Sequence, residues 1–251
     1  MGPPHGPPGP PEHGPYAELG PPAARALVER LRQQGEEAGL AAVGVAPATP
    51  MARARRVLEQ RKAEGLDGGM QFTYRNPARS TDPSRVLPGA AALVVGAWWY
   101  GEAAPLTPAG ERPRGRVARY AWRDHYAGLR GALGQLADIL RASGWAARVV
   151  ADDNALVDRA AATGAGLGWY GKNTNVLLPG RGSWFVLGSV VTDAPLPPDA
   201  PAPAGSEMGD GCGPCRRCLG ACPPLPGLAG AGSGGFPLRV QGGVGRPHLR
   251  L

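Results

Sequence analysis

The clearest pattern of hydrophobic positions along the chain is a helical repeat over residues 123–143. Apolar side chains recur there at intervals of three and four residues, and Gly144 follows as a stop signal. The members of this repeat are Tyr126, Leu129, Leu133, Leu136 and Leu140. Shorter repeats of the same kind predict three more helices, over residues 23–40, 51–64 and 154–163. In the last of these, Leu156, Val157 and Ala160 are expected to face inward.

Short apolar runs of strand length lie between the helical segments. Five of them are expected to be strands, over residues 41–46, 90–100, 145–150, 175–178 and 183–191. Turn-forming residues separate the last two, which predicts that these two runs pair as a β-hairpin. The mixed order of helices and strands, with adjacent antiparallel pairs, predicts an α/β (α+β) domain.

Composition changes sharply at both ends of the 251-residue chain, which holds 40 Gly and 29 Pro. Segments rich in Gly and Pro bury little apolar surface, so both ends are expected to be irregular. The sequence therefore divides into a Pro/Gly-rich segment, a main domain, a small cysteine-containing module and an irregular tail. Their expected bounds are 1–22, 23–204, 205–224 and 225–251.

A formal net charge of +7 favours an anionic partner such as nucleic acid or a phosphorylated ligand, although an Arg-rich surface alone would also produce it. No stretch reaches the roughly 18 apolar residues that a membrane span needs. The first residues contain no apolar core of a signal peptide. The sequence is thus expected to be cytoplasmic, without a membrane partner.

All four cysteines lie within eleven residues, in the pattern Cys212-x-x-Cys215-x-x-Cys218-x-x-x-Cys222 followed by proline. This is the ferredoxin spacing for a [4Fe–4S] cluster. Zinc is the alternative, but it favours two separated cysteine knuckles or Cys/His pairs. In ferredoxins with two clusters the fourth cysteine binds the other cluster, so Cys222 is expected to bind either this cluster or a second one.

The segment before the cysteines contains Gly166-x-Gly168-x-x-Gly171, which has the form of a dinucleotide fingerprint. That fingerprint should follow a strand and open a helix, whereas here a helix precedes and a strand follows. The glycines are expected instead to let backbone approach something flat, or to form a tight turn.

Six arginines with interleaved aromatic residues lie within nineteen positions: Arg112, Arg114, Arg116, Arg119, Arg123 and Arg130, with Tyr120, Trp122 and Tyr126. Arginine on phosphate and aromatic rings on unstacked bases hold single-stranded RNA loops. The alternative is a solvated basic face beside aromatic core residues. His125 is the single histidine of the middle of the chain. It is expected to lie on the face of the helix over residues 123–143, near its start.

Several motifs together resemble the epoxyqueuosine reductases. The run VADDNALVDRAAATGAGLGWYGKNTNVLLPGRGSWFVLGSVVTDAPL, which begins at Val150, is similar to the central region of that family, and the similarity continues through the cysteines to Pro223. Upstream motifs occur in the family's order: Gly68-Gly69-Met70, Arg79 with Asp82-Pro83, Leu87-Pro88-Gly89 and Arg119-Tyr120-Ala121. The resemblance extends from about Ala23 to Pro223.

The resemblance implies a cobalamin-binding, nitroreductase-like domain followed by a ferredoxin-type module with two [4Fe–4S] clusters. The implied reaction is the last step of queuosine biosynthesis, in which epoxyqueuosine in the tRNA anticodon loop is reduced to queuosine. Its implied partners are tRNA and an external electron donor, and the protein is expected to be a monomer.

The family's proton donor is an aspartate that maps to Asp152. A carboxyl donates a proton near pH 7 only if its pKa is raised, for example by burial. The alternative for Asp152 or its neighbour Asp153 is to cap the helix that is expected after Asn154. The residues expected to bind the cofactor are Gly166, Gly168, Gly171, Lys172, Asn173 and Ser183, and the expected cluster ligands are Cys212, Cys215, Cys218 and Cys222.

The sequence departs from the family after Pro223, where no second cysteine motif follows. The family pattern therefore predicts a chain that is cut short within its iron–sulfur module. Two other functions stay open at this point. One is a cobalamin-dependent reductase of another substrate, such as a halogenated compound, and the other is an inactive protein that binds a cofactor or RNA.

Overall fold

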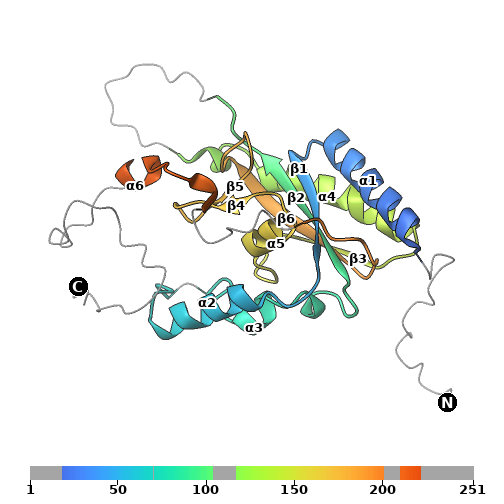
Figure 1. Ribbon diagram of the computed structural model, residues 1–251, viewed down its shortest axis with the longest axis horizontal. Helices are drawn as coiled ribbons and strands as arrows, with labels where there is room; N and C mark the ends of the chain where they lie inside the picture. The colour runs from blue at the N-terminus through green and yellow to red at the C-terminus, as the bar shows by residue number, and fades with distance from the viewer. Residues whose placement is uncertain (1–18, 70, 104–116, 201–209, 222–251) are drawn as a thin grey trace, which may run out of the picture.

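A four-stranded antiparallel sheet forms the centre of the protein, which was analysed as a computed structural model that describes residues 19–69, 71–103, 117–200 and 210–221 (Figure 1). The strands are β1 (Ala42–Pro47), β2 (Ala92–Trp99), β3 (Ala147–Ala151) and β6 (Phe185–Thr192), in the order β1-β2-β6-β3. Register places Val95 opposite Gly44 on one side and Ser189 on the other. This antiparallel arrangement is of the α+β kind that the sequence predicts.

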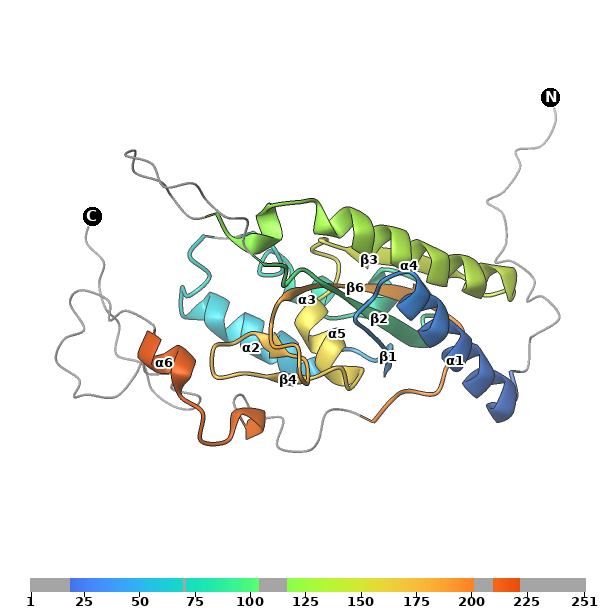
Figure 2. The ribbon, with the colours of Figure 1, turned by 90° about the horizontal axis from the view of Figure 1, so that it is seen from above.

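Helices cover both faces of the sheet (Figure 2). Helices α1 (Pro21–Glu37) and α4 (His125–Ala142) pack on one face, and α5 (Asp158–Gly164) packs on the other. Strand β2 is buried on both faces because Val94 belongs to the first core and Leu93 and Val95 to the second. A strand covered on both sides reads as a continuous apolar run, which is what residues 90–100 show.

The long helices form where the sequence predicts them, for identifiable local reasons. The carboxylate of Asp124 caps α4 by accepting a hydrogen bond from the Ala127 amide at 2.9 Å. All four leucines of the predicted repeat are buried in α4. Gly144 follows the helix with a φ of +86°, a conformation that favours glycine.

The remaining helices and turns are short, apart from α2. Helix α2 (Ala52–Ala63) is basic, as expected, and none of its residues is buried. The others are α3 (Pro77–Ser80), η1 (Pro83–Arg85), η2 (Arg119–Ala121), η3 (Asp210–Cys212) and α6 (Arg217–Ala221). No helix in the described ranges is both long and apolar enough to cross a membrane.

Two predicted elements differ from the structure. Helix α5 begins at Asp158, four residues later than expected, because a turn occupies the intervening residues. Its buried residues are Ala161 and Ala162, while Leu156 is buried from within the turn.

The predicted hairpin of residues 175–178 and 183–191 is also wrong. Strand β5 (Val176–Leu177) pairs with β4 (Trp169–Tyr170), and β6 pairs with β2 and β3. A single bridge between Leu178 and Gly182 closes the expected turn. The described part of the cysteine-containing module forms only η3 and α6, so the expected ferredoxin-like module is not established.

The segment after β6 returns to the free edge of the sheet at β1. The amide of Asp199 donates to the Val45 carbonyl and the Val45 amide donates to the Asp199 carboxylate, both at 2.8 Å. Arg32 of α1 also forms an ion pair with Asp199. This segment therefore covers the middle of an edge strand.

Candidate active site

A loop at the end of β3 carries the predicted proton donor. Asp152 has a φ of +56°, one of two positive values among the non-glycine residues that the structure describes. Asp153 stabilises the loop by accepting a hydrogen bond from the Ala155 amide at 2.9 Å. Because α5 begins only at Asp158, this contact is a local turn and not a helix cap. Asp152 thus has an exposed side chain and a backbone conformation that non-glycine residues rarely adopt.

A second carboxyl lies behind this loop, at the first position of α5. The residue Asp158 is partly exposed as a whole, but its Oδ1 atom is buried and has no hydrogen-bond partner within the described structure. Burial raises the pKa of Asp158 to about 8, and the charges of Asp152 and Asp153 add to the effect, while Arg159 opposes it. Asp158 is therefore mostly protonated at neutral pH.

Aromatic residues border these carboxyls. Burial raises the pKa of Tyr126, with a further contribution from the Asp152 carboxylate and, at the alkaline pH where it too is ionised, from Asp158. The ring of Tyr100, which follows β2, lies 5.6 Å from the His125 ring and 6.1 Å from the Trp184 ring, centroid to centroid. The ends of β2, β3 and β6 and the start of α4 thus bring phenols, indoles and carboxyls to one end of the sheet.

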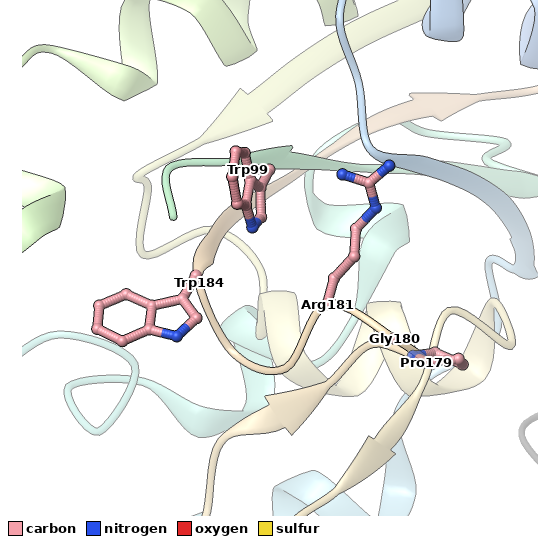
Figure 3. A pocket seen from close by; sticks show the side chains of 5 residues that line it. All are labelled: Trp99, Pro179, Gly180, Arg181 and Trp184. Carbon is pink, nitrogen blue, oxygen red and sulfur yellow. The ribbon is translucent and has the colours of Figure 1, made fainter. Parts of the chain in front are cut away.

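An open hollow of about 470 Å³ adjoins this aromatic group and is lined by Trp99, Pro179, Gly180, Arg181 and Trp184 (Figure 3). The two indoles are 40% and 45% exposed, which is high for such large apolar side chains. The Arg181 side chain extends from the loop between β5 and β6, with both indoles on the same side of it (Figure 3). These surfaces can stack against a flat, partly anionic ligand.

The arginine-rich segment reaches this end of the sheet only in part. Arg119 lies over the Trp184 ring at 4.6 Å from its centroid, beside the hollow. Arg123 and Arg130 form exposed ion pairs with Glu102 at 3.3 Å and Asp124 at 3.5 Å, as on a solvated basic face. Arg112, Arg114 and Arg116 lie outside the described residues.

The predicted cofactor-binding glycines pack against the protein itself. A Cβ atom added to Gly168 would lie 2.0 Å from the Leu177 carbonyl oxygen, and one added to Gly166 would lie 2.4 Å from that of Ala200. Gly166 also has a φ of +68°. Close approach of backbone to backbone accounts for a glycine at each of these two positions.

The remaining predicted residues lie on two loops. Gly171, Lys172 and Asn173 form the tight connection between β4 and β5, where the Gly171 amide donates to the Asn175 carbonyl at 2.8 Å. Asn173 is exposed, and its side-chain oxygen accepts from the Asn175 amide at 3.2 Å. Ser183 is half-buried next to Trp184, on the loop that borders the hollow.

The cysteine segment lies beside the β4–β5 hairpin (Figure 1). Cys212 and Cys218 are half-buried, Cys215 is exposed, and none of these three forms a disulfide. Cys222 lies outside the described residues. Within the described part, no three Cys, His, Asp or Glu side chains gather closely enough to hold one metal ion.

Sequence reasoning did not identify several residues of this region. Asp158 has a recognisable signal, a carboxylate inside an otherwise apolar stretch. Trp99 and Tyr100 were expected only as the end of a buried strand, and their position next to Trp184 at this end of the sheet depends on the pairing of β2 with β6.

No protein-family model matches the sequence. Comparison with individual proteins does find relatives. The chain is 34% identical over 200 residues to the epoxyqueuosine reductase of Xanthomonas campestris. This alignment covers 77% of this chain and 54% of the relative. It is 37% identical over 207 residues to that of Synechococcus sp. (strain CC9605), covering 78% and 60%.

Solved structures agree with these relatives. A crystal structure of selenomethionine-labelled epoxyqueuosine reductase aligns with a TM-score of 0.71 at 29% identity, covering 80% of this chain and 52% of the other. A crystal structure of epoxyqueuosine reductase with an epoxyqueuosine-modified tRNA stem loop also aligns at 0.71, with 28% identity and coverage of 79% and 52%. The chain spans between a half and two thirds of the length of these proteins. The resemblance predicted from the motifs is confirmed: over most of its length the chain is similar to epoxyqueuosine reductases.

Proposed function

We propose that this chain reduces epoxyqueuosine to queuosine in the anticodon loop of tRNA. The observation that carries the proposal is the loop at the end of β3, which presents Asp152 near Asp158 and Tyr126. The hollow adjoins the same aromatic group through the contact of Trp184 with Tyr100. A relative of similar fold has been crystallised with an epoxyqueuosine-modified tRNA stem loop, which supports the choice of substrate.

Removing the epoxide oxygen as water takes two electrons and two protons and leaves a carbon–carbon double bond. Asp152 would donate a proton to the leaving oxygen once bound substrate and cofactor bury its carboxyl, which the turn that Asp153 stabilises holds at the end of β3. Asp158 keeps its proton at neutral pH, so it stays uncharged behind this loop.

We further propose that cobalamin and a [4Fe–4S] cluster serve the reaction, as the resemblance implies. The exposed indoles and Arg181 at the hollow fit a large flat ligand with polar edges, and the reduced thiols of Cys212, Cys215 and Cys218 fit the cluster. When bound, the two groups would supply the electrons. Lys172 and Asn173 remain proposed contacts of this machinery, and Cys222 remains the proposed fourth ligand of this cluster or a ligand of another.

A basic aromatic surface near the hollow would receive the anticodon loop, with Arg119 as its described contribution. An external donor would deliver electrons one at a time. A cytoplasmic location is part of the proposal, because tRNA modification of this kind takes place where tRNA is found. A monomeric state is the last part of it.

The test is an assay of the anaerobically purified chain, reconstituted with iron, sulfide and cobalamin, on tRNA that carries epoxyqueuosine. Wild-type protein is expected to form queuosine, and Asp152→Asn to slow the reaction by about 100-fold or more. Asp153→Asn is the matched control and should retain most of the activity. A wild-type chain that binds iron and cobalamin but forms no queuosine would refute the proposal, and turnover of a halogenated compound alone would favour the other reductase function.

A further inference from the structure

The ammonium group of Lys172 joins the β4–β5 hairpin to the cysteine segment. Its Nζ atom donates to the Gly213 carbonyl at 2.7 Å and to the Cys215 carbonyl at 3.0 Å. These two acceptors lie 41 and 43 residues away along the chain. Both carbonyls belong to the turn between the first two cysteines, so one cation binds the backbone from which those thiols project.

A second contact lies next to this one. The indole of Trp169 in β4 packs so closely on Gly211 that a Cβ atom there would be 2.5 Å from the ring carbons. Both contacts come from the same short hairpin, three residues apart, and both meet the segment at or within three residues of Cys212. The cysteine segment is thus held at two adjacent points.

The composition of the chain makes this lysine unusual. The sequence contains 25 arginines and only two lysines, Lys62 and Lys172. An ammonium group is compact and carries three donors that can diverge toward two carbonyls, whereas the planar guanidinium of arginine suits two parallel acceptors. The geometry at Gly213 and Cys215 therefore calls for lysine specifically.

We propose that Lys172, together with Trp169, is a positioning residue that fixes the cysteine segment on the β4–β5 hairpin and so sets where its thiol ligands gather. Its role is to hold the backbone that carries the ligands, and it does not bind iron. The consequence for iron depends on the proposed function, but the docking itself does not. A positive charge beside the thiolates would also shift the reduction potential of a bound cluster to a more positive value.

Amine-specific labelling followed by mass spectrometry tests the docking on the full chain without iron or substrate. Lys62 is the internal control because it is exposed on α2 and donates only to the Arg75 carbonyl, at a longer 3.4 Å. We expect Lys172 to be labelled about tenfold or more slowly than Lys62, since its nitrogen is held by two carbonyls. Gly211→Ala should remove this protection because the new Cβ would collide with Trp169. Gly220→Ala is the matched control on the same segment, since nothing lies within 4 Å of the atom it adds.

Iron retention tests the consequence. After reconstitution, Lys172→Met is expected to lose iron to a chelator about tenfold faster than wild type, as removal of outer-shell partners of metal ligands does elsewhere. Its cluster potential should shift to a more negative value. Lys172→Arg should restore most of the potential, because the charge returns, but less of the iron retention, while Lys62→Met should change neither.

The two experiments separate this inference from the proposed function. Equal labelling of Lys172 and Lys62 in the wild type overturns the docking whether or not iron binds. Suppose that the wild type takes up no iron while Lys172 is labelled rapidly in Gly211→Ala but slowly in the wild type and in Gly220→Ala. In that case the positioning role stands and the iron–sulfur part of the proposed function fails. If iron binds and Lys172→Met retains it as wild type does, the proposed consequence for the ligands is wrong.

Discussion

Replacing Asp158 with asparagine should make the stability of the protein less sensitive to a rise in pH from about 4 to about 8. Asparagine has the same shape as aspartate but cannot ionise. In the wild type, a buried oxygen without a partner and two neighbouring carboxylates raise the pKa of Asp158 from 3.8 to about 8. The folded chain therefore keeps a proton at Asp158 up to about pH 8, whereas the unfolded chain loses it near pH 4.

The size of the effect follows from this difference in bound protons. Between pH 6 and pH 9 the unfolded chain binds no proton at this position, and the folded chain goes from fully to about one-tenth protonated. The free energy of unfolding therefore falls as pH rises, by about 3 kcal/mol over this range for a folded pKa of about 8. Most of this loss occurs below pH 8, because above it the folded chain gives up the proton as well, and the contribution is absent in the asparagine variant.

The assay is urea unfolding at pH 6 and pH 9, followed by circular dichroism, for the wild type and for Asp158→Asn. Tyrosine and cysteine ionisation contribute to both proteins, so the difference between them isolates Asp158. Asp138→Asn is the matched control, since Asp138 forms an exposed ion pair with Arg141 on α4. The reasoning fails if Asp158→Asn loses as much stability between the two pH values as the wild type does.

Three further substitutions test the packing and the loop described above. Gly168→Ala should destabilise the fold by about 3 kcal/mol or more in urea unfolding, because its Cβ would lie 2.0 Å from the Leu177 carbonyl oxygen. The control is Gly131→Ala, whose Cβ would enter open space on α4, and it should be neutral or stabilising in the same titration. Leu133→Ala should cost about 2–5 kcal/mol, since the side chain is fully buried between α4 and the sheet, and an unchanged melting temperature would contradict the burial. Asp152→Gly should abolish the proposed activity yet raise stability by about 1 kcal/mol, because glycine adopts a φ of +56° without strain; calorimetry that shows a lower melting temperature would argue against that strain.

The long elements could be predicted because their patterns depend on burial alone. Helix α4 presents a leucine at each turn to the sheet, and β2 is buried on both faces, so each reads clearly from its own residues. The start of α5 could not, because the turn before it contains apolar residues that are buried without being helical. The hairpin prediction failed for a related reason: a turn at Gly182 exists, but the strand that pairs with β5 comes earlier in the chain.

The candidate site divides in the same way. Asp152 and the cysteines are recognisable from local motifs, and the structure places Asp152 at the end of a strand. The contact of Lys172 with the cysteine segment joins residues about forty positions apart. Neither the hydrophobic periodicity nor the composition of the chain predicts a contact over that separation. The raised pKa of Asp158 likewise depends on which groups the fold brings around it.

The return of the chain to β1 at Asp199 has a consequence for assembly. An uncovered edge strand offers its amides and carbonyls to any other extended chain, which favours aggregation. Here Asp199 takes up both backbone groups of Val45, and Arg32 fixes its carboxylate in place. A cut or substitution that releases this segment would therefore leave the backbone amides and carbonyls of strand β1 free to pair with another molecule. Self-association would then increase even though the core of the domain remained intact.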